Sequence, residues 1–316
     1  MPAQNEVRVN VGERTLTLTN LDKVLYPSTG FTKAEVVQYY LAIAPTMLPH
    51  LAGRCLTRIR FPNGVDKGSF YEKNLPSGAP PWLGRDLVAA SGETISYVTV
   101  STPEELVLLA NLASLELHAP QWVVDDTTRR ADGAVIMDGL DEPRATTLMV
   151  DLDPGTGITM VDSAHAAMIV ATSLAELGLL PYVKTTGSKG LQISAAIAPT
   201  PSEQVTDWVK QFSQRLATQQ PDRFVVTMAK DQRVGRIYLD YLQNKAARNT
   251  IAAYSMRARE YPSVATPLLW DEVAAVTSPD DLRFSPADVL ARIEEHGDLF
   301  ADVLTRDGPE LPLLEA

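Results

Sequence analysis

The sequence contains very little cysteine and histidine. Cys55 is the only cysteine, and four histidines are spread over 316 residues. A single cysteine excludes an intrachain disulfide and a cysteine-based zinc site, and the scattered histidines do not have the spacing of zinc ligands. This composition is typical of a protein that works in a reducing cytoplasm.

Long apolar runs are also missing. No apolar stretch approaches the about 18 residues that a membrane-spanning helix needs, and the first residues, Met1–Glu6, are polar. We therefore expect a soluble, unexported protein without a membrane partner. With 45% apolar residues, a chain of 316 residues can still bury a sizeable core.

Positive charge is scarce, and the net charge is −11. Taken globally, this charge argues against a nucleic-acid partner, because phosphate backbones are bound mainly by lysine and arginine. The distribution is uneven, however: residues 1–75 and 181–260 carry +3 and +6, whereas residues 76–180 and 261–316 carry −11 and −9. Two basic segments can form a DNA-binding face on an acidic chain, although ordinary solvated charge would give the same count.

Two aspartates end an apolar run in the middle of the chain. Asp151 and Asp153 follow the run Thr146–Val150 and are followed at once by Pro154 and Gly155. In a β-strand, residues two apart project from the same face, with Cα atoms about 6.6 Å apart. Carboxylates held so close repel each other, and Mg²⁺ or Mn²⁺, which prefer hard oxygen ligands, would relieve the repulsion. Because Asp, Pro and Gly also favour turns, the motif alone leaves a plain turn open.

Two further segments offer groups that phosphoryl transfer needs. The stretch Thr185–Gly190 lies between strand-like runs at 181–184 and 191–197, and its two glycines, three hydroxyls and lysine can bind phosphates. It lacks the spacing of a Walker A loop. Downstream, the alternating run Arg236–Asn244 contains Asp240, which needs a partner or a metal inside a strand. A third carboxylate would complete a site for two cations about 3.5 to 4 Å apart.

Three motifs resemble, in this order, the active-site motifs of the archaeo-eukaryotic primase superfamily. The resemblance is closer to the polymerase domain of bacterial end-joining DNA ligases and its stand-alone primase-polymerase relatives. The motifs are Asp151-Leu-Asp-Pro-Gly155, Thr186-Gly-Ser-Lys-Gly-Leu191 and Asp240-Tyr-Leu-Gln-Asn244. Four further segments extend the resemblance over nearly the whole chain: Leu18–Pro27, Arg60–Asp66, His118–Trp122 and Ala253–Arg257.

The resemblance implies roles for individual residues. The catalytic residues, which would also hold two Mn²⁺ or Mg²⁺ ions, would be Asp151, Asp153 and Asp240. Eight residues would bind the nucleotide: His118, Thr186, Ser188, Lys189, Gln192, Arg233, Gln243 and Arg257. Four residues would bind DNA, two at a 5′-phosphate beyond a gap and two stacked on a template base: Lys23 and Lys33, and Phe70 and Tyr71.

Several of these residues also allow a purely structural role. His118 could pack in a core or lie at a helix C-terminus, Arg233 could be a surface charge, and the aromatic pair could be half-buried strand packing. Gln192 is a departure, because the family pattern typically has a histidine there, and glutamine donates a hydrogen bond without carrying charge. Lys33 lies in the first turn of an expected helix, where a bound anion would stabilise it.

Helices and strands alternate along the chain without internal repeats. We therefore expect an α+β fold, a primase-polymerase catalytic core with a central mixed or antiparallel sheet flanked by helices. The capping pattern at Thr32 predicts a helix over about 33–48. Proline at the first helical position after Thr102 predicts a second helix that runs to about His118.

The expected organisation is a single primase-polymerase domain over 1–316, with a short N-terminal extension over about 1–14 and a C-terminal helical element over about 285–305. The resemblance implies a template-dependent nucleotidyltransferase, a DNA-directed DNA or RNA polymerase. It would add NTPs or dNTPs to a primer 3′-hydroxyl at gapped or primer-template DNA during repair by non-homologous end joining, as a monomer at the bacterial nucleoid.

Two other functions stay open at this point. One is a primase that initiates chains de novo, and the other is a DNA-end-binding module with weakened catalysis, for which Gln192 is the only support. No ligase or nuclease motif is visible in the 316 residues. A separate DNA ligase and an end-binding protein are therefore the expected protein partners.

Overall fold

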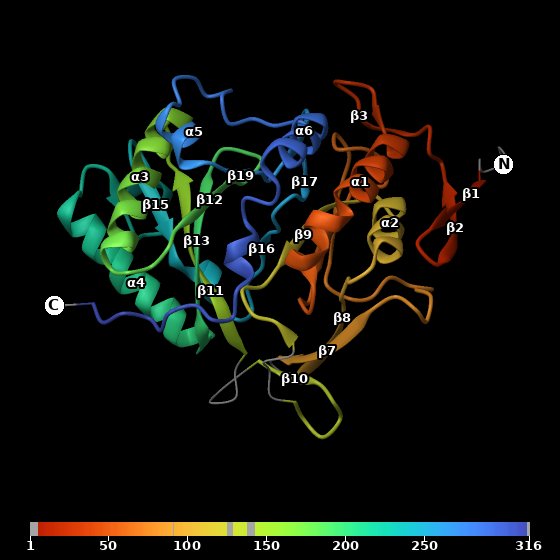
Figure 1. Cartoon of the computed structure of the whole chain (residues 1–316), viewed down its shortest axis with the longest axis horizontal. Helices are drawn as coiled ribbons and strands as arrows, with labels where there is room; N and C mark the ends of the chain where they lie inside the picture. The colour runs from red at the N-terminus through yellow and green to blue at the C-terminus, as the bar shows by residue number, and fades with distance from the viewer. Residues whose placement is uncertain (1–5, 91, 125–128, 138–142, 315–316) are drawn as a thin grey trace.

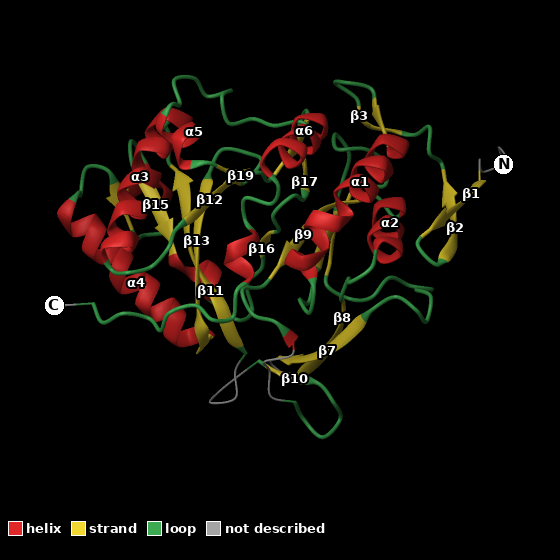
Figure 2. Ribbon diagram, in the orientation of Figure 1, coloured by secondary structure: helices red, strands yellow, loops and turns green. Residues whose placement is uncertain are grey.

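The fold is built around two neighbouring β-sheets, each packed against its own helices (Figure 1). The computed structural model describes residues 6–90, 92–124, 129–137 and 143–314. Helices and strands are intermixed along these ranges, which confirms the expected α+β class (Figure 2). Within them, no helix combines the length and the apolar character that crossing a bilayer requires.

The larger sheet has six strands in the order β14-β15-β11-β13-β12-β19. At its centre, β11 (Arg144–Pro154) pairs antiparallel with β13 (Leu191–Pro201). The flanking strands are β15 (Ile237–Asp240), β12 (Tyr182–Thr185), β19 (Pro267–Leu268) and β14 (Phe224–Val225). Only the β14–β15 pair in this sheet is parallel, so the sheet is mixed, as expected.

Two long helices cover one face of this sheet, α3 (Met160–Glu176) and α4 (Ser202–Gln219) (Figure 1). A short helix, α5 (Trp270–Ala274), packs beside α3. Alternate residues of β11, among them Leu148, Val150 and Leu152, belong to the core under the helices. Because side chains alternate along a strand, the aspartates at 151 and 153 project from the opposite face.

The second sheet has the order β16-β9-β5-β6 and packs with two helices of the N-terminal part. Its strands are β16 (Thr250–Ile251), β9 (Ser114–Ala119), β5 (Thr57–Arg60) and β6 (Phe70–Glu72). The helices are α1 (Lys33–Leu51) and α2 (Pro103–Asn111), and a capping box starts each of them. The core of this part is separate from the core beneath α3 and α4.

The helix predicted to run to His118 is wrong in its C-terminal half. Helix α2 ends at Asn111, and the following backbone turns through Ala113, which has a φ of 57°. Residues Ser114–Ala119 then form β9, between β5 and β16. In a strand, the alternating Leu115 and Leu117 are both buried in the core. This burial outweighs the helix propensity of leucine and glutamate.

Smaller elements complete the described chain. A three-stranded sheet holds β10 (Val135–Ile136), β7 (Arg85–Ala90) and β8 (Glu93–Val98). Three hairpins pair β1 (Glu6–Val11) with β2 (Arg14–Thr19), β3 (Val24–Tyr26) with β4 (Phe31–Thr32), and β17 (Met256–Ala258) with β18 (Pro262–Val264). Near the C-terminus, α6 (Pro286–His296) and a 3₁₀ turn (Ala301–Leu304) fall within 285–305, where a helical element was predicted.

Candidate active site

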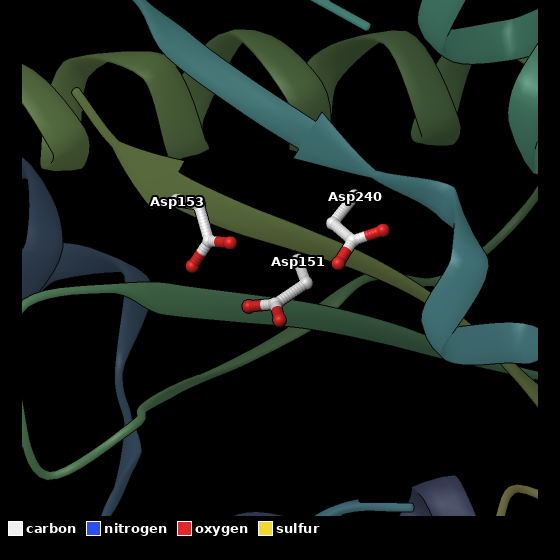
Figure 3. A group of neighbouring side chains, drawn as sticks. All are labelled: Asp151, Asp153 and Asp240. Carbon is white, nitrogen blue, oxygen red and sulfur yellow. The ribbon is translucent and has the colours of Figure 1, made fainter. Parts of the chain in front are cut away.

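Three carboxylates converge on the face of the large sheet that α3 and α4 leave uncovered. Asp151 and Asp153 come from β11, and Asp240 is the last residue of the neighbouring strand β15, directly opposite Asp151 (Figure 3). One carboxylate oxygen from each lies within 4.8 Å of the others. Asp151 and Asp240 are buried, whereas Asp153 is half-buried. We call these three residues the carboxylate cluster.

The electrostatics of this cluster favour a bound cation. Burial, followed by the charges of Asp153 and Asp240, raises the pKa of Asp151 to about 8. Burial and the charge of Asp240 likewise raise the pKa of Asp153, against the opposing effect of Arg233. Among the described residues, the buried Oδ1 of Asp151 has no hydrogen-bond partner. Crowded hard oxygens with an unsatisfied buried acceptor fit a divalent cation such as Mg²⁺ or Mn²⁺.

Asp240 is held in place by hydrogen bonds from its own strand and the following 3₁₀ turn. The Tyr238 hydroxyl and the Leu242 amide donate to its Oδ1 at 2.9 and 3.0 Å, and Gln243 Nε2 donates to its Oδ2 at 2.8 Å. Gln243 was predicted to contact the nucleotide. In this structure it orients a member of the carboxylate cluster, while its side chain also lines the pocket beside it.

A pocket of about 390 Å³ opens in front of the carboxylate cluster. We call it the central pocket. Asp151, Asp153 and all eight residues that the sequence predicted to bind a nucleotide line it: His118, Thr186, Ser188, Lys189, Gln192, Arg233, Gln243 and Arg257. Asn249 and Arg259, which the sequence did not single out, line it as well. Residues up to about 140 positions apart in the chain are therefore gathered around one cavity.

The loop between β12 and β13 forms one wall of the central pocket. The Thr186 amide and hydroxyl both donate to the Gly190 carbonyl, at 3.0 and 3.1 Å, so this threonine closes the base of the loop. Gly187 has a φ of +65°, and a Cβ there would lie 2.6 Å from Cγ of Arg257. Glycine therefore lets the loop approach that arginine closely. Ser188 and Lys189 are exposed at the tip.

A second wall comes from the segment before β15. The Arg233 guanidinium lies 3.9 Å from the centroid of the Tyr238 ring, and its Nε donates to the Thr227 carbonyl at 3.1 Å. A cation held over an aromatic face is more ordered than a free surface charge. Gly155 donates its amide to the Arg236 carbonyl at 2.9 Å, and a Cβ at 155 would collide with the Arg233 carbonyl oxygen. This contact joins the aspartate motif to the arginine segment.

A buried glutamate holds two predicted nucleotide-binding residues, His118 and Arg257, in the lining of the central pocket. Glu116 lies two residues before His118 on β9; its Oε2 is 3.0 Å from His118 Nε2, and its Oε1 is 3.3 Å from Arg257 Nε. The Ala258 amide donates to the same Oε1 at 3.0 Å. Burial opposes ionisation of Glu116, but His118 and Arg257 hold its pKa below the ordinary value. Burial also lowers the pKa of Arg257, and Glu116 opposes that shift.

Gln192 is buried at the back of the central pocket, directly opposite Asp151 on the neighbouring strand. Its Oε1 accepts a hydrogen bond of 2.5 Å from Lys184 Nζ. Lys184 is itself buried; burial lowers the pKa of its ammonium group to about 7, and the Asp151 carboxylate opposes that shift. The site therefore contains a buried lysine that the sequence did not point to.

The four predicted DNA-binding residues lie outside the lining of the central pocket, on the N-terminal part of the fold. Lys23 Nζ donates to Asn63 Oδ1 at 3.0 Å, and the buried Lys33 donates to the Thr19 carbonyl at 2.5 Å. Burial and then the charges of Lys23 and Arg60 lower the pKa of Lys33 to about 8. Cations that disfavour one another in this way would be stabilised by a bound anion.

The aromatic pair on β6 is exposed rather than packed. Phe70 and Tyr71 have 55% and 63% of their surfaces accessible, on the edge strand of the four-stranded sheet. Half-buried strand packing, the alternative left open for this pair, is therefore wrong. Two adjacent exposed rings on an edge strand are available to stack on a ligand.

Besides Asn249 and Arg259, Glu116 and Lys184 were also missed from the sequence. Glu116 shares a strand face with His118, and the alternation Leu-Glu-Leu-His could have shown this if β9 had been recognised as a strand. Lys184 directly precedes the loop segment 185–190, but only the pairing of β12 with β13 places it opposite Gln192.

The family model described as the LigD primase-polymerase domain matches residues 32–300. Among solved structures, the polymerase domain of Mycobacterium tuberculosis ligase D in complex with DNA is similar to this chain. It has a TM-score of 0.84 and 40% sequence identity, and the match covers 94% of this chain and 100% of that one.

Longer proteins from several bacteria are also similar to the chain. The multifunctional non-homologous end joining protein LigD of Mycolicibacterium smegmatis is 44% identical over 92% of this chain and 36% of its own length. The bifunctional LigD of Bacillus subtilis is 30% identical over 91% of this chain and 44% of its own length. The chain thus spans about two fifths of these relatives, and it belongs to the family of LigD primase-polymerase domains.

Proposed function

We propose that this chain is a template-dependent nucleotidyltransferase that extends a DNA primer at short gaps or ends during non-homologous end joining. The observation that carries this proposal is the carboxylate cluster at the edge of a cation-lined pocket of about 390 Å³. Negative ligands for cations next to positive groups for phosphates form the arrangement that nucleotidyl transfer requires. The named relatives are end-joining proteins, and the similar solved domain is in complex with DNA.

The carboxylate cluster would hold two divalent cations, Mn²⁺ or Mg²⁺. Bound there, such cations lower the pKa of a primer 3′-hydroxyl and neutralise a triphosphate. The protein fixes the ligand geometry: the cross-strand pair Asp151 and Asp240 sets the spacing, and Tyr238 and Gln243 orient Asp240. Asp153 is more accessible than the other two and lines the central pocket together with Arg233, so it would lie on the side where the nucleotide enters.

The cationic side chains of the central pocket would bind the triphosphate of an incoming NTP or dNTP. Ser188 and Lys189 are exposed at the loop tip, Arg257 is fixed by Glu116, and Arg233 lies over Tyr238. The pocket therefore offers positive charge from three separate segments. Catalysis of this kind depends on positioning and charge stabilisation rather than on a protein nucleophile.

The N-terminal cations would bind the 5′-phosphate on the far side of a gap. Lys23 and Lys33 are close enough to lower the pKa of Lys33, and a phosphate dianion would offset their repulsion. The exposed rings of Phe70 and Tyr71 would stack on a template base. Changing both lysines to glutamine should therefore remove any preference for 5′-phosphorylated gaps. The ratio of extension on phosphorylated gaps to extension on unphosphorylated gaps would be measured for both proteins. The same ratio in the wild type and in the double variant would contradict this role.

One observation favours de novo priming as a second candidate function. A cavity of about 400 Å³ adjoins the central pocket on the other side of the loop tip, and it is lined by Ser188, Lys189, Arg259, Tyr261 and Arg283, among others. A primase needs a second nucleotide site, and cations beside an exposed tyrosine suit a nucleotide. Dinucleotide synthesis from NTPs on single-stranded DNA without a primer would establish this activity.

Primer extension tests the main proposal directly. A labelled primer would be extended across a short gap bearing a 5′-phosphate, with Mn²⁺ and either NTPs or dNTPs. The Asp151→Asn/Asp153→Asn double variant should lose extension while keeping gap affinity in a DNA-binding assay. Asp207→Asn, an exposed residue on α4, is the matched control and should extend normally. Extension by the double variant at the normal rate would refute the assignment.

The proposal also sets the cellular context. With gapped DNA as its substrate, the chain would act at the bacterial nucleoid. Sealing of the filled gap would come from a DNA ligase activity outside these 316 residues, together with a protein that binds the DNA ends. The monomeric state expected from the sequence remains a prediction, which sedimentation of the chain with and without gapped DNA would check.

A further inference from the structure

Lys184 and Gln192 form a buried polar pair behind the carboxylate cluster. The two residues lie opposite each other on β12 and β13, with 2% and 3% of their surfaces accessible. Gln192 is in turn opposite Asp151 on β11. Cross-strand partners project from the same face of a sheet. The three side chains therefore form a row, Lys184, Gln192 and Asp151, across three adjacent strands.

The chemistry of this row decides how the glutamine amide is oriented. A carboxamide offers an oxygen that accepts and an NH₂ that donates, and the two ends have nearly the same shape. An ammonium group only donates, so the 2.5 Å contact of Lys184 Nζ must be with the Gln192 oxygen. The NH₂ end is then left for the other neighbour in the row. That neighbour is Asp151, directly opposite Gln192 in the strand register, and an ionised carboxylate offers only acceptors.

We propose that Lys184 is a positioning residue that fixes the carboxamide of Gln192, so that Gln192 in turn orients the Asp151 carboxylate for a divalent cation. This inference rests on the proposed function and deepens it. Gln192 lines the central pocket, whereas Lys184 is not among its lining residues, so Lys184 acts through Gln192 and not on a nucleotide.

The burial of Lys184 supports a role in the site over a role in stability. Removing an ammonium group from water is costly, and an apolar side chain would fill the same space without that cost. A cavity of about 50 Å³, whose lining includes Lys184, Thr147 and Ser194, adjoins the row. A residue that lowers stability but orders a metal ligand is expected where function requires it.

A double-mutant cycle with Mn²⁺ as the probe tests this inference. Calorimetric titration of the protein alone with Mn²⁺ would compare wild type, Lys184→Met, Gln192→Leu and the combined variant. Residues that orient metal ligands typically change affinity about 10-fold to 100-fold when they are lost. We expect Lys184→Met to weaken Mn²⁺ binding about 10-fold with an unchanged or higher Tm. In the Gln192→Leu background, the same change should cost less than about two-fold.

Two outcomes would overturn the inference. One is wild-type Mn²⁺ affinity in Lys184→Met. The other is a full 10-fold loss from Lys184→Met in the Gln192→Leu background, which would mean that Lys184 acts on the carboxylates directly. The matched control is Lys210→Met. Lys210 lies on α4, and its ammonium group lies over the ring of Tyr241. If Lys184→Met does not fold, unchanged Mn²⁺ affinity in Gln192→Leu alone overturns the inference.

The titration also keeps this inference separate from the proposed function. Absence of primer extension by the wild-type chain would remove the proposed function, but it would leave the Mn²⁺ cycle unaffected. Conversely, normal extension by Lys184→Met together with unchanged Mn²⁺ affinity would refute only the role of Lys184.

Discussion

Divalent cations should stabilise the folded chain, and the effect should grow with pH. The pKa of Asp151 is raised from 3.8 to about 8 because the carboxyl group is buried beside Asp153 and Asp240. Between these two values the folded state holds a proton that the unfolded chain has released. Without metal, the free energy of unfolding therefore falls as the pH rises through this interval. A cation competes with that proton, so its stabilising effect increases over the same interval.

The size of the effect follows from mass action and chain length. At a Mg²⁺ concentration 100-fold above its Kd, a single site adds about 2.7 kcal/mol. An unfolding entropy of about 2.1 cal/mol/K per residue gives about 0.7 kcal/mol/K for 316 residues. The Tm should therefore rise by about 4 °C at about pH 8.5, and by less at about pH 6.

Thermal unfolding with Mg²⁺ or with EDTA measures both quantities. In EDTA at about pH 8.5, Asp151→Asn should melt above the wild type, because one of three repelling charges is gone. Its response to Mg²⁺ should fall below about 1 °C. The reasoning would be refuted by an equal response to Mg²⁺ in Asp151→Asn, or by a larger response at about pH 6 than at about pH 8.5.

Three further changes test other parts of the site. Glu116→Gln removes the charge that fixes His118 and Arg257; because hydrogen bonds to charged groups contribute about 1.5 to 3 kcal/mol, the nucleotide KM should rise roughly 10-fold or more in extension kinetics, and an unchanged KM would contradict the role. Phe70→Ala together with Tyr71→Ala should weaken template binding by about 1 to 3 kcal/mol per lost stack in fluorescence anisotropy, with the Tm nearly unchanged because both rings are exposed. Gly155→Ala should lower both the Tm and the rate of extension, because its Cβ would collide with the Arg233 carbonyl oxygen. A Tm equal to that of the wild type would show that the backbone at Arg233 can shift to make room.

The features that the sequence predicted well are local along the chain. The capping pattern at Thr32 and the proline after Thr102 coincide with the starts of α1 and α2, since such start signals depend only on residues a few positions apart. The aspartates at 151 and 153 share a strand face because the strand period is fixed. The predicted nucleotide-binding residues all line the central pocket. Their arrangement around it could not be predicted, because they come from several separate segments.

The features that could not be predicted depend on contacts between distant segments. Glu116 meets Arg257 across 141 positions of chain, and only the packing of β17 beside β9 brings them together. Lys184 becomes part of the site through its register with Gln192. The helix expected up to His118 was wrong because local propensity was followed where burial of alternate leucines decides the structure.

The two separate cores impose a condition on how activity is lost. The carboxylate cluster lies on strands whose other face packs on the core beneath α3 and α4, whereas Met256 and Ala258, which flank Arg257, pack on the core of α1 and α2. A small shift of one core against the other would misalign phosphate and metal ligands while every helix and strand stayed folded. Activity in urea should then be lost before the circular dichroism signal, because activity depends on how the two cores are placed against each other.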